Sequence, residues 1–220
     1  MELRVLEGVF DANRKVAEEN RKLFREHGIL AVNLMASPGA GKTSLIDRTL
    51  SLLKDSVKVG VIEGDIASSV DADKVKAHGI PVVQINTGGA CHLDAAMIRQ
   101  ALDHLPLGEL QLLIIENVGN LVCPAEFDLG ESLKVTILSV AEGHDKPLKY
   151  PLIFTQTDAL VLNKVDLLGM GDFDLEALRE TVTKMNPDVT IFELSCRTGQ
   201  GLEEWARWLE GMVRRTASSS

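Results

Sequence analysis

The sequence has few cysteines, few aromatic residues and no long apolar run, and these shortages exclude several classes of protein. Three cysteines in 220 residues are too few, and odd in number, for the disulfide framework of a small secreted protein. No run reaches the roughly 18 apolar residues of a membrane span. The first segment, MELRVLEGVFDANRKVAEENRKLF, is too charged for a signal peptide. The sequence therefore predicts a cytoplasmic protein, not associated with membranes, whose thiols stay reduced.

Positive charge is also scarce. The chain has 23 Lys and Arg against 32 Asp and Glu, a net charge of -9. Such a chain is repelled by a phosphate backbone, so nucleic acid is not an expected partner. The length suits one sizeable domain, and no repeat or linker divides it. We expect a charge-rich amphipathic helix over 1–28, packed on a single domain over 29–215, and a flexible tail over 216–220.

Short apolar runs alternate with helical patterns along the rest of the chain. Near-continuous apolar strands separated by helices are typical of a mostly parallel sheet that is covered on both faces. The sequence therefore predicts a three-layer, doubly wound α/β fold. The expected strands are 29–35, 57–63, 81–85, 110–116, 133–140, 158–164 and 190–195, and the expected helices after the first are 43–54, 92–105, 174–185 and 201–215.

A glycine-rich segment, ASPGAGKTS at 36–44, follows the first strand and opens a helix. It fits the phosphate-loop pattern G-x-x-x-x-G-K-[ST], except that Ala36 stands where the first glycine belongs. Glycines let the backbone turn its N–H groups toward phosphates, and the helix N-terminus adds positive potential. Lys42 is expected at the β and γ phosphates and Thr43 at Mg²⁺. The predicted nucleotide contacts here are Gly39, Ala40, Gly41, Lys42, Thr43 and Ser44.

Two later segments indicate which base is bound. NKVD at 163–166 has the N-K-x-D pattern of guanine recognition, in which Asp166 accepts from N1–H and the exocyclic amine. Asn163 is expected to bond the base edge and neighbouring loops, and the Lys164 stem to cover the ring. SCRTGQG at 195–201 is expected to close on the base through Ser195 and Cys196, with Cys196 as a packing residue. NKVD argues against an ATP-dependent kinase.

Acidic residues after two strands are candidates for the Mg²⁺ and switch region. EGDIASSVD at 63–71 supplies Asp65 and Asp71, and ENVGN at 116–120 supplies Glu116. Glu116 with Gly119 has the form of a D-x-x-G switch with Glu in place of Asp, in which Gly119 offers its N–H to the γ-phosphate. A charge that ends an apolar run is otherwise costly, which favours a role for Glu116. For Asp65 a solvated loop charge is an equal alternative.

Cys91 and His92 are neighbours in the irregular stretch GGACHLD, and Cys123 follows the switch glycine. Loops after two parallel strands emerge at the same edge of a sheet, so the three side chains are expected to converge. Two thiolates and an imidazole suit Zn²⁺ or Ni²⁺, and three ligands leave an open position. The alternative is that these cysteines are small buried apolar residues.

The segments GAGKT, EGD, CHLDA, ENVGNLVCP and NKxD, in this order over residues 5–213, closely resemble the HypB family of hydrogenase nickel-incorporation GTPases. The resemblance implies a SIMIBI-class P-loop fold, slow GTP hydrolysis and a GTP-promoted homodimer. It also implies nickel delivery to the precursor of the [NiFe] hydrogenase large subunit, with a zinc-binding accessory protein, HypA. It assigns metal binding to Cys91, His92 and Cys123, and Mg²⁺ association to Asp71 and Glu116.

Two other functions stay open at this point. A urease-type nickel-insertion GTPase is less favoured, because that family carries a Cys-Pro-His motif that this chain lacks. A nucleotide-switched interaction protein with a structural zinc site is the other. The chain departs from the resembled family at Ala36 and also at Ala96, where members often carry histidine.

Overall fold

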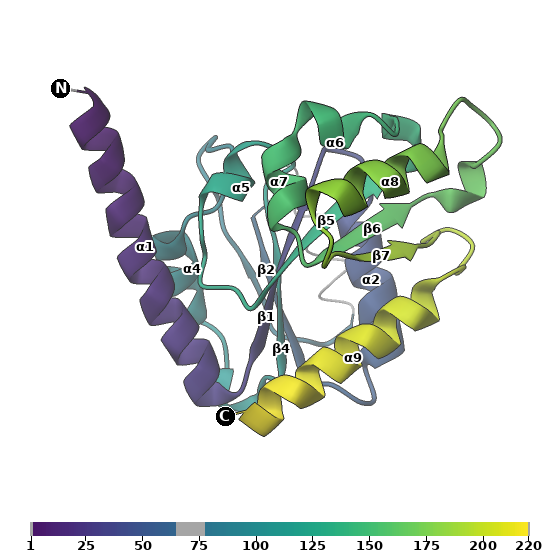
Figure 1. Cartoon of the computed structure of the whole chain (residues 1–220). Coiled ribbons are helices and arrows are strands. Elements are labelled where there is room, and N and C mark those ends of the chain that lie inside the picture. The colour runs from purple at the N-terminus through teal and green to yellow at the C-terminus, as the bar shows by residue number, and fades with distance from the viewer. Residues whose placement is uncertain (1, 65–77, 220) are drawn as a thin grey trace.

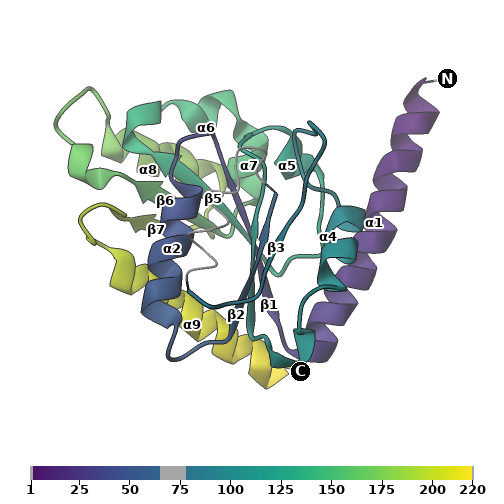
Figure 2. The ribbon, with the colours of Figure 1, turned by 180° about the vertical axis from the view of Figure 1, so that it is seen from behind.

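The fold is a parallel β-sheet between two layers of helices (Figures 1 and 2). The computed structural model describes residues 2–64 and 78–219. In this part of the chain seven strands lie in the order β3-β2-β4-β1-β5-β6-β7, and all neighbours are parallel. The predicted three-layer, doubly wound architecture is confirmed. The strands are β1 Leu30–Ala36, β2 Val59–Glu63, β3 Val82–Gln84, β4 Leu112–Glu116, β5 Leu133–Ser139, β6 Ala159–Asn163 and β7 Thr190–Glu193.

Helices cover both faces because successive strand residues point to opposite sides. One face packs against α2 and α9, and the other packs against α1 and α4 at one end and α5, α7 and α8 at the other (Figures 1 and 2). Within the described residues no helix has the length and apolar content needed to cross a membrane. The helices are α1 Glu2–His27, α2 Lys42–Leu53, α4 Ala95–Leu102, α5 Cys123–Glu126, α6 Lys146–Lys149, α7 Pro151–Gln156, α8 Leu175–Met185 and α9 Leu202–Ser219.

Strand β1 is buried on both faces of the sheet. Leu30, Val32 and Leu34 are buried against α2 and α9, whereas Ala31 and Met35 are buried on the opposite face. A strand buried on both sides reads as a continuous apolar run, which is how it was recognised in the sequence. The strand therefore holds the segment that follows it, the glycine-rich loop, at a fixed point on the sheet edge.

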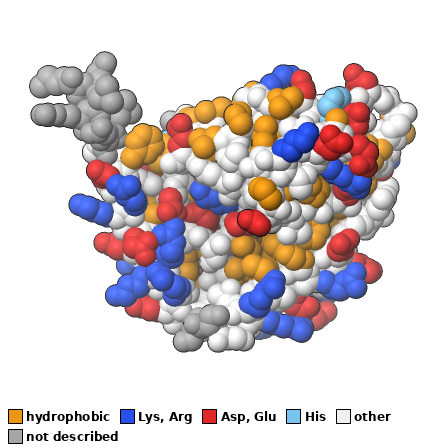
Figure 3. Space-filling model, in the orientation of Figure 1, with side chains coloured by type: hydrophobic (Ala, Val, Ile, Leu, Met, Phe, Trp, Pro, Cys, Tyr) orange, Lys and Arg blue, Asp and Glu red, His pale blue; other side chains and the backbone are white. Residues whose placement is uncertain are grey.

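Helix α1 is attached through its C-terminal half. Phe24 is buried against α4, and the buried amide of Asn20 donates to Ala95 O (2.9 Å) and Leu129 O (3.0 Å). Its outer side carries ion pairs such as Arg21–Glu18 and Arg25–Glu18. Blue and red side chains alternate along the left side of Figure 3, where this helix lies in the same orientation as in Figure 1. The helix thus braces segments that lie far apart in the sequence.

The C-terminal helix is longer than the sequence predicts. We expected a flexible tail from residue 216, but α9 continues to Ser219. The hydroxyls of Thr216 and Ser218 bond the carbonyls of Met212 and Arg214, one turn earlier. No glycine or proline interrupts this stretch, so the helix has no local reason to stop at residue 215.

Candidate nucleotide and metal site

The candidate residues gather at one edge of the sheet because all the described strands run in the same direction. The glycine-rich loop follows β1, the switch segment 117–122 follows β4, and the NKVD segment follows β6. The SCRTGQG segment follows β7. In open parallel α/β sheets, ligands bind at the carboxyl ends of the strands. The topology therefore brings together four segments that lie far apart in the sequence, between residues 36 and 201.

The phosphate loop takes the conformation that its glycines allow. Gly39 and Gly41 have φ of +79° and +105°, in the left-handed region that favours glycine. A Cβ on Gly41 would collide with the Asn163 amide, so only glycine fits there. Lys42 begins α2 and is 5% exposed. The N-terminus of α2 and the loop N–H groups give this point the positive potential that phosphates need.

Ala36 does not disturb this loop. It is the last residue of β1 and lies fully buried in the core. Among the described residues, Lys164 is the one non-glycine residue with positive φ, so Ala36 has no need of glycine's freedom. Alanine is therefore accommodated at the first position of the motif, because this residue lies in the strand conformation at the end of β1.

Asn163 connects three segments of the candidate base site. Its Nδ2 donates to Ala40 O (2.9 Å), and its Oδ1 accepts from Lys164 N (2.7 Å) and Cys196 N (3.2 Å). Lys164 Nζ donates to Gly39 O (2.7 Å). The predicted link of Asn163 to neighbouring loops is present. Its amide is occupied by this bracing, and the expected bond to the base edge stays a prediction.

Asp166 lines the cavity at this edge of the sheet, and two neighbouring side chains fix its carboxylate. It accepts a hydrogen bond from the Ser195 hydroxyl and an ion pair from Arg197 at 2.7 Å. The hydrogen bond from Ser195, and then the Arg197 charge, lower the pKa of this carboxyl from its ordinary value. The acid is therefore an ionised acceptor at neutral pH. A cavity of about 450 Å³ lies here, lined by Gly41, Thr43, Ser44, Asp47, Arg48, Asn163, Lys164, Asp166, Leu167, Cys196 and Arg197.

The switch acid lies against the phosphate loop. Thr43 Oγ1 donates to Glu116 Oε1 at 3.1 Å, so a hydroxyl and a carboxylate oxygen meet where Mg²⁺ is expected. A Cβ on Gly119 would come within 3.1 Å of Pro38, which shows that the switch segment passes close over the loop. Asp65 and Asp71, the other acids expected at Mg²⁺, lie outside the described residues.

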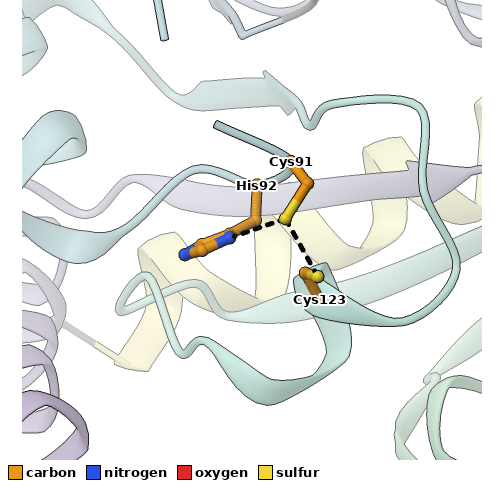
Figure 4. A group of neighbouring side chains, drawn as sticks. All are labelled: Cys91, His92 and Cys123. Carbon is orange, nitrogen blue, oxygen red and sulfur yellow. Dashed lines mark hydrogen bonds between the residues drawn. The ribbon is translucent and has the colours of Figure 1, made fainter. Parts of the chain in front are cut away.

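Cys91, His92 and Cys123 form one cluster, as predicted (Figure 4). Their candidate donor atoms all lie within 4.8 Å of one another. Cys91 Sγ is 3.0 Å from Cys123 Sγ and 3.6 Å from His92 Nδ1. A metal bound tetrahedrally by sulfur at about 2.3 Å and nitrogen at about 2.1 Å separates its ligands by roughly 3.5–3.8 Å. The three donors therefore fit a single ion after small side-chain adjustments.

The irregular backbone before α4 makes the adjacent pair possible. Gly88 and Gly89 have φ of +61° and +95°, and Asp94 caps α4 by accepting from Met97 N (2.8 Å). The sequence predicts that this helix begins at residue 92. Because the Asp94 carboxylate fills the N-cap position, the helix begins at Ala95 instead. His92 consequently stays outside the helix and free to turn toward Cys91.

The environment of the cluster sets its proton affinities. The hydrogen bond with Cys91 is the largest cause of a raised pKa at the Cys123 thiol, with burial second. Burial lowers the pKa of His92, whose ring stacks on Phe127 at 3.8 Å between centroids. The imidazole is therefore held neutral and oriented, as a metal ligand must be.

Sequence reasoning missed several residues of the site. Arg197 pairs with Asp166, and Arg48 donates to Cys196 O (2.9 Å). Phe127 supports His92, and the side chain of Asn120 donates to Cys91 O (3.2 Å). The pattern ENVGN predicted a switch segment, but it did not predict a role for Asn117 or Asn120. Their roles arise only from the folded contacts.

The parallel α/β fold, the glycine-rich loop and Asp166 at the cavity together define a P-loop nucleotide-binding protein. Residues 30–193 match the CobW/HypB/UreG nucleotide-binding domain. The hydrogenase maturation factor HypB of Escherichia coli K12 is 50% identical over 92% of this chain and 70% of its own length. The chain belongs to the CobW/HypB/UreG family and, within it, to the HypB proteins.

Solved structures agree with this assignment. Archaeoglobus fulgidus HypB has a TM-score of 0.87 and 43% identity, covering 92% of this chain and 99% of that one. Helicobacter pylori HypB in complex with nickel has a TM-score of 0.88 and 38% identity, covering 94% and 97%. The receptor FtsY of Elizabethkingia anophelis, at 15% identity, TM-score 0.55, and 82% and 65% coverage, shares the fold alone. The SIMIBI-class P-loop fold is thereby confirmed.

Proposed function

We propose that this protein is a GTP-hydrolysing metallochaperone that delivers nickel during maturation of [NiFe] hydrogenase. The observation that carries the proposal is the Cys91, His92 and Cys123 cluster, in which Cys123 directly follows the switch segment that passes close to the phosphate loop at Gly119. The HypB relatives are named hydrogenase maturation factors, and one HypB structure contains nickel. These relatives favour a hydrogenase role over the urease-type alternative.

In the proposed cycle, GTP binds at the cavity described above. Asp166 accepts the two donors of guanine, and Lys42 neutralises the β and γ phosphates. Thr43 and Glu116 hold Mg²⁺, with Asp65 and Asp71 as the further acids of this site. Gly119 N–H is directed to the γ-phosphate, so hydrolysis releases the switch segment. The contact between Thr43 and Glu116 supports this arrangement.

Nickel is the cargo of the proposed cycle. Two thiolates and an imidazole bind it, and the incomplete ligand set lets it leave again. Zn²⁺ suits the same donors and is the competing occupant. Because Cys123 lies four residues after Gly119, a shift of the switch segment on hydrolysis changes the ligand geometry.

Among the described residues the metal site offers only three donors from one chain, and this bears on the partners of the protein. Three donors from one chain favour a GTP-promoted homodimer, in which a second copy completes the coordination. The zinc-binding accessory protein HypA is the proposed metal donor or co-chaperone, and the precursor of the hydrogenase large subunit the acceptor. All of these steps are assigned to the cytoplasm, where the thiols stay reduced.

The test is a nickel titration of the purified protein loaded with GDP or with a non-hydrolysable GTP analogue. Thiolate-to-nickel absorbance reports binding, and solution mass is followed in parallel. We expect thiolate bands and a nickel affinity that depends on the nucleotide. Cys123→Ala should lose at least tenfold in nickel affinity while binding GTP normally, because one of three ligands is removed.

Cys196→Ala is the matched control, because this thiol is buried beside the base site and burial raises its pKa to about 11. It should bind nickel as the unmodified protein does. Equal nickel affinity in Cys123→Ala would defeat the assigned site. Zinc that co-purifies, resists mild chelation and ignores the nucleotide would instead support a structural-zinc interaction protein.

A further inference from the structure

One buried side chain, Asn117, holds the switch segment and the metal-ligand segment together. Its side chain is fully buried at the end of β4. Its Oδ1 accepts two backbone hydrogen bonds, from Val118 N (2.9 Å) and from Leu93 N (3.1 Å). A carbonyl oxygen has two lone pairs, so both are used here.

The orientation of this amide is fixed by its surroundings. A backbone N–H can only donate, so Oδ1 must face Val118 and Leu93. The Nδ2 group then donates to Asn33 Oδ1 (3.1 Å), and Asn33 Nδ2 donates to Glu131 Oε1 (3.2 Å). The position of Oδ1 is set by the two backbone N–H groups and does not require Asn33. A change at one end therefore cannot be absorbed by a flip of the Asn117 amide.

The two backbone N–H groups that donate to Asn117 Oδ1 belong to two different sites. One lies in the segment expected at the γ-phosphate, and the other lies beside the metal-ligand pair. Val118 precedes Gly119, which lies against Pro38 of the phosphate loop. Leu93 directly follows His92, and its side chain packs against Gly64, where a Cβ would come within 2.5 Å. One oxygen atom thus joins the residue before the phosphate-side glycine to the residue after a metal ligand.

We propose that Asn117 is the positioning residue that makes metal affinity depend on the bound nucleotide. This inference rests on the proposed function, because it needs a metal site that responds to GTP. When Gly119 N–H binds the γ-phosphate, Val118 shifts with it, and the shared oxygen carries the shift to Leu93 and so to the Cys91–His92 pair. A second link, from Asn120 Nδ2 to Cys91 O, is exposed, so water competes for both groups and the link contributes less than the buried one.

The experiment compares the ratio of nickel dissociation constants in the GDP and GTP-analogue states. We expect a ratio of roughly 5–150 in the unmodified protein, the usual range for coupled sites. In Asn117→Ala the ratio should fall at least about threefold, and the part that remains is carried along the chain from Gly119 to Cys123. Asn33→Ala, the matched control, loses a buried asparagine of the same chain but keeps the shared oxygen, and should retain the ratio. A purely structural loss in Asn117→Ala would weaken both states alike and spare the ratio.

The outcomes separate the two proposals. A ratio retained in Asn117→Ala overturns this inference and leaves the proposed function standing. A ratio of one in the unmodified protein overturns both. Amide hydrogen exchange of the unmodified protein serves if the variant does not fold. The Leu93 and Val118 amides should change protection together between the two nucleotide states, and a change at Val118 alone overturns the inference.

Discussion

We predict that base selection depends on one residue, Asp166. The Ser195 hydroxyl and Arg197 guanidinium fix its carboxylate at the cavity and keep it ionised. A carboxylate can accept from both N1–H and the amine of guanine, whereas adenine offers no such pair of donors. The geometry therefore makes the base preference depend on one acceptor group.

Asp166→Asn should reverse that preference. An amide offers one acceptor and one donor, so one guanine donor loses its partner, and GTP affinity should fall at least about a hundredfold. Xanthosine triphosphate, which has a carbonyl where guanine has its amine, should bind the variant better than GTP does. Competition titrations of a fluorescent nucleotide measure both. Asp188→Asn, at an exposed aspartate after α8, is the control and should bind GTP normally. Unchanged GTP affinity in Asp166→Asn would remove Asp166 from the base site.

The residues that were predicted from the sequence are those whose chemistry is local. Gly41, Thr43 and Asp166 belong to short motifs with fixed spacing, and the structure places each at the expected sheet edge. Asn117 and Phe127 were missed because their roles depend on partners 24 and more residues away. No pattern along the chain records which loop a buried amide will meet.

Helix α1 is an element whose attachment depends on a close backbone approach. Gly130 has φ of +89°, and a Cβ there would collide with Ala17 O and approach Asn20 Cβ to 2.7 Å. The segment 128–131 therefore lies directly on the helix. Asn13 adds a hydrogen bond to Asp128 O at 2.8 Å.

Gly130→Ala should destabilise the protein more than the loss of glycine's conformational freedom alone. We expect about 3 kcal/mol or more, combining left-handed strain with the clash against α1. Gly169→Ala is the control, because Gly169 has φ of +84° and no atom near its Cβ position, and it should cost only about 1–2 kcal/mol. Urea unfolding of both variants gives the comparison. An equal decrease in the free energy of unfolding of the two variants would show that α1 shifts to accommodate the new methyl group.

An ion pair between α1 and this segment predicts a response to acid. Burial alone would raise the pKa of Asp128, but hydrogen bonds from Arg21 and Gly130 N–H outweigh it and leave the pKa below 3.8. In the unfolded chain the carboxyl regains its ordinary value. Between these two pKa values the unfolded state binds more protons, so the free energy of unfolding falls as pH falls through that window.

Arg21→Met should make that fall shallower, because it removes the main cause of the lowered pKa. The Arg21 and Asp128 side chains are 32% and 37% exposed, so solvent screening limits the difference to about 1 kcal/mol or less. Arg25→Met, which loses only a bond to Glu18, is the control. Urea unfolding between pH 2.5 and 6, values chosen to bracket the ordinary pKa of a carboxyl, measures the slopes. If the free energy of unfolding depends on pH identically in the two variants, the Arg21–Asp128 pair does not cause the response to acid.

Elements were predicted well where burial makes the pattern regular. All seven described strands fall within predicted segments to within one residue. The central strands are buried on both faces and mostly apolar, and the edge strands β3 and β7 still contain a short apolar run. The limits of helices were less certain. Asp94 moved the start of α4 by capping it, whereas α9 continued past the expected tail because no glycine or proline stops it after residue 215.

At the scale of the whole molecule, the parallel sheet places two chemically different sites on one edge. The carboxyl ends of β1 and β4 carry the phosphate loop and the switch segment, and the segment after β3 carries Cys91 and His92. Neighbouring loops at this edge carry the residues of both sites. The two affinities are therefore expected to be linked, and linkage between equilibrium affinities is reciprocal.

Reciprocity gives the last prediction. If the GTP analogue strengthens nickel binding over GDP by some factor, nickel must strengthen binding of the analogue relative to GDP by the same factor. Nucleotide titrations with and without saturating nickel measure the second factor, at a fixed protein concentration so that any dimerisation is equal in both. The two factors should agree within about twofold, and both should fall toward one in Cys123→Ala. A nickel effect on nucleotide affinity that survives in Cys123→Ala would mean that the ion acts elsewhere, as a substitute for Mg²⁺ at Thr43 and Glu116.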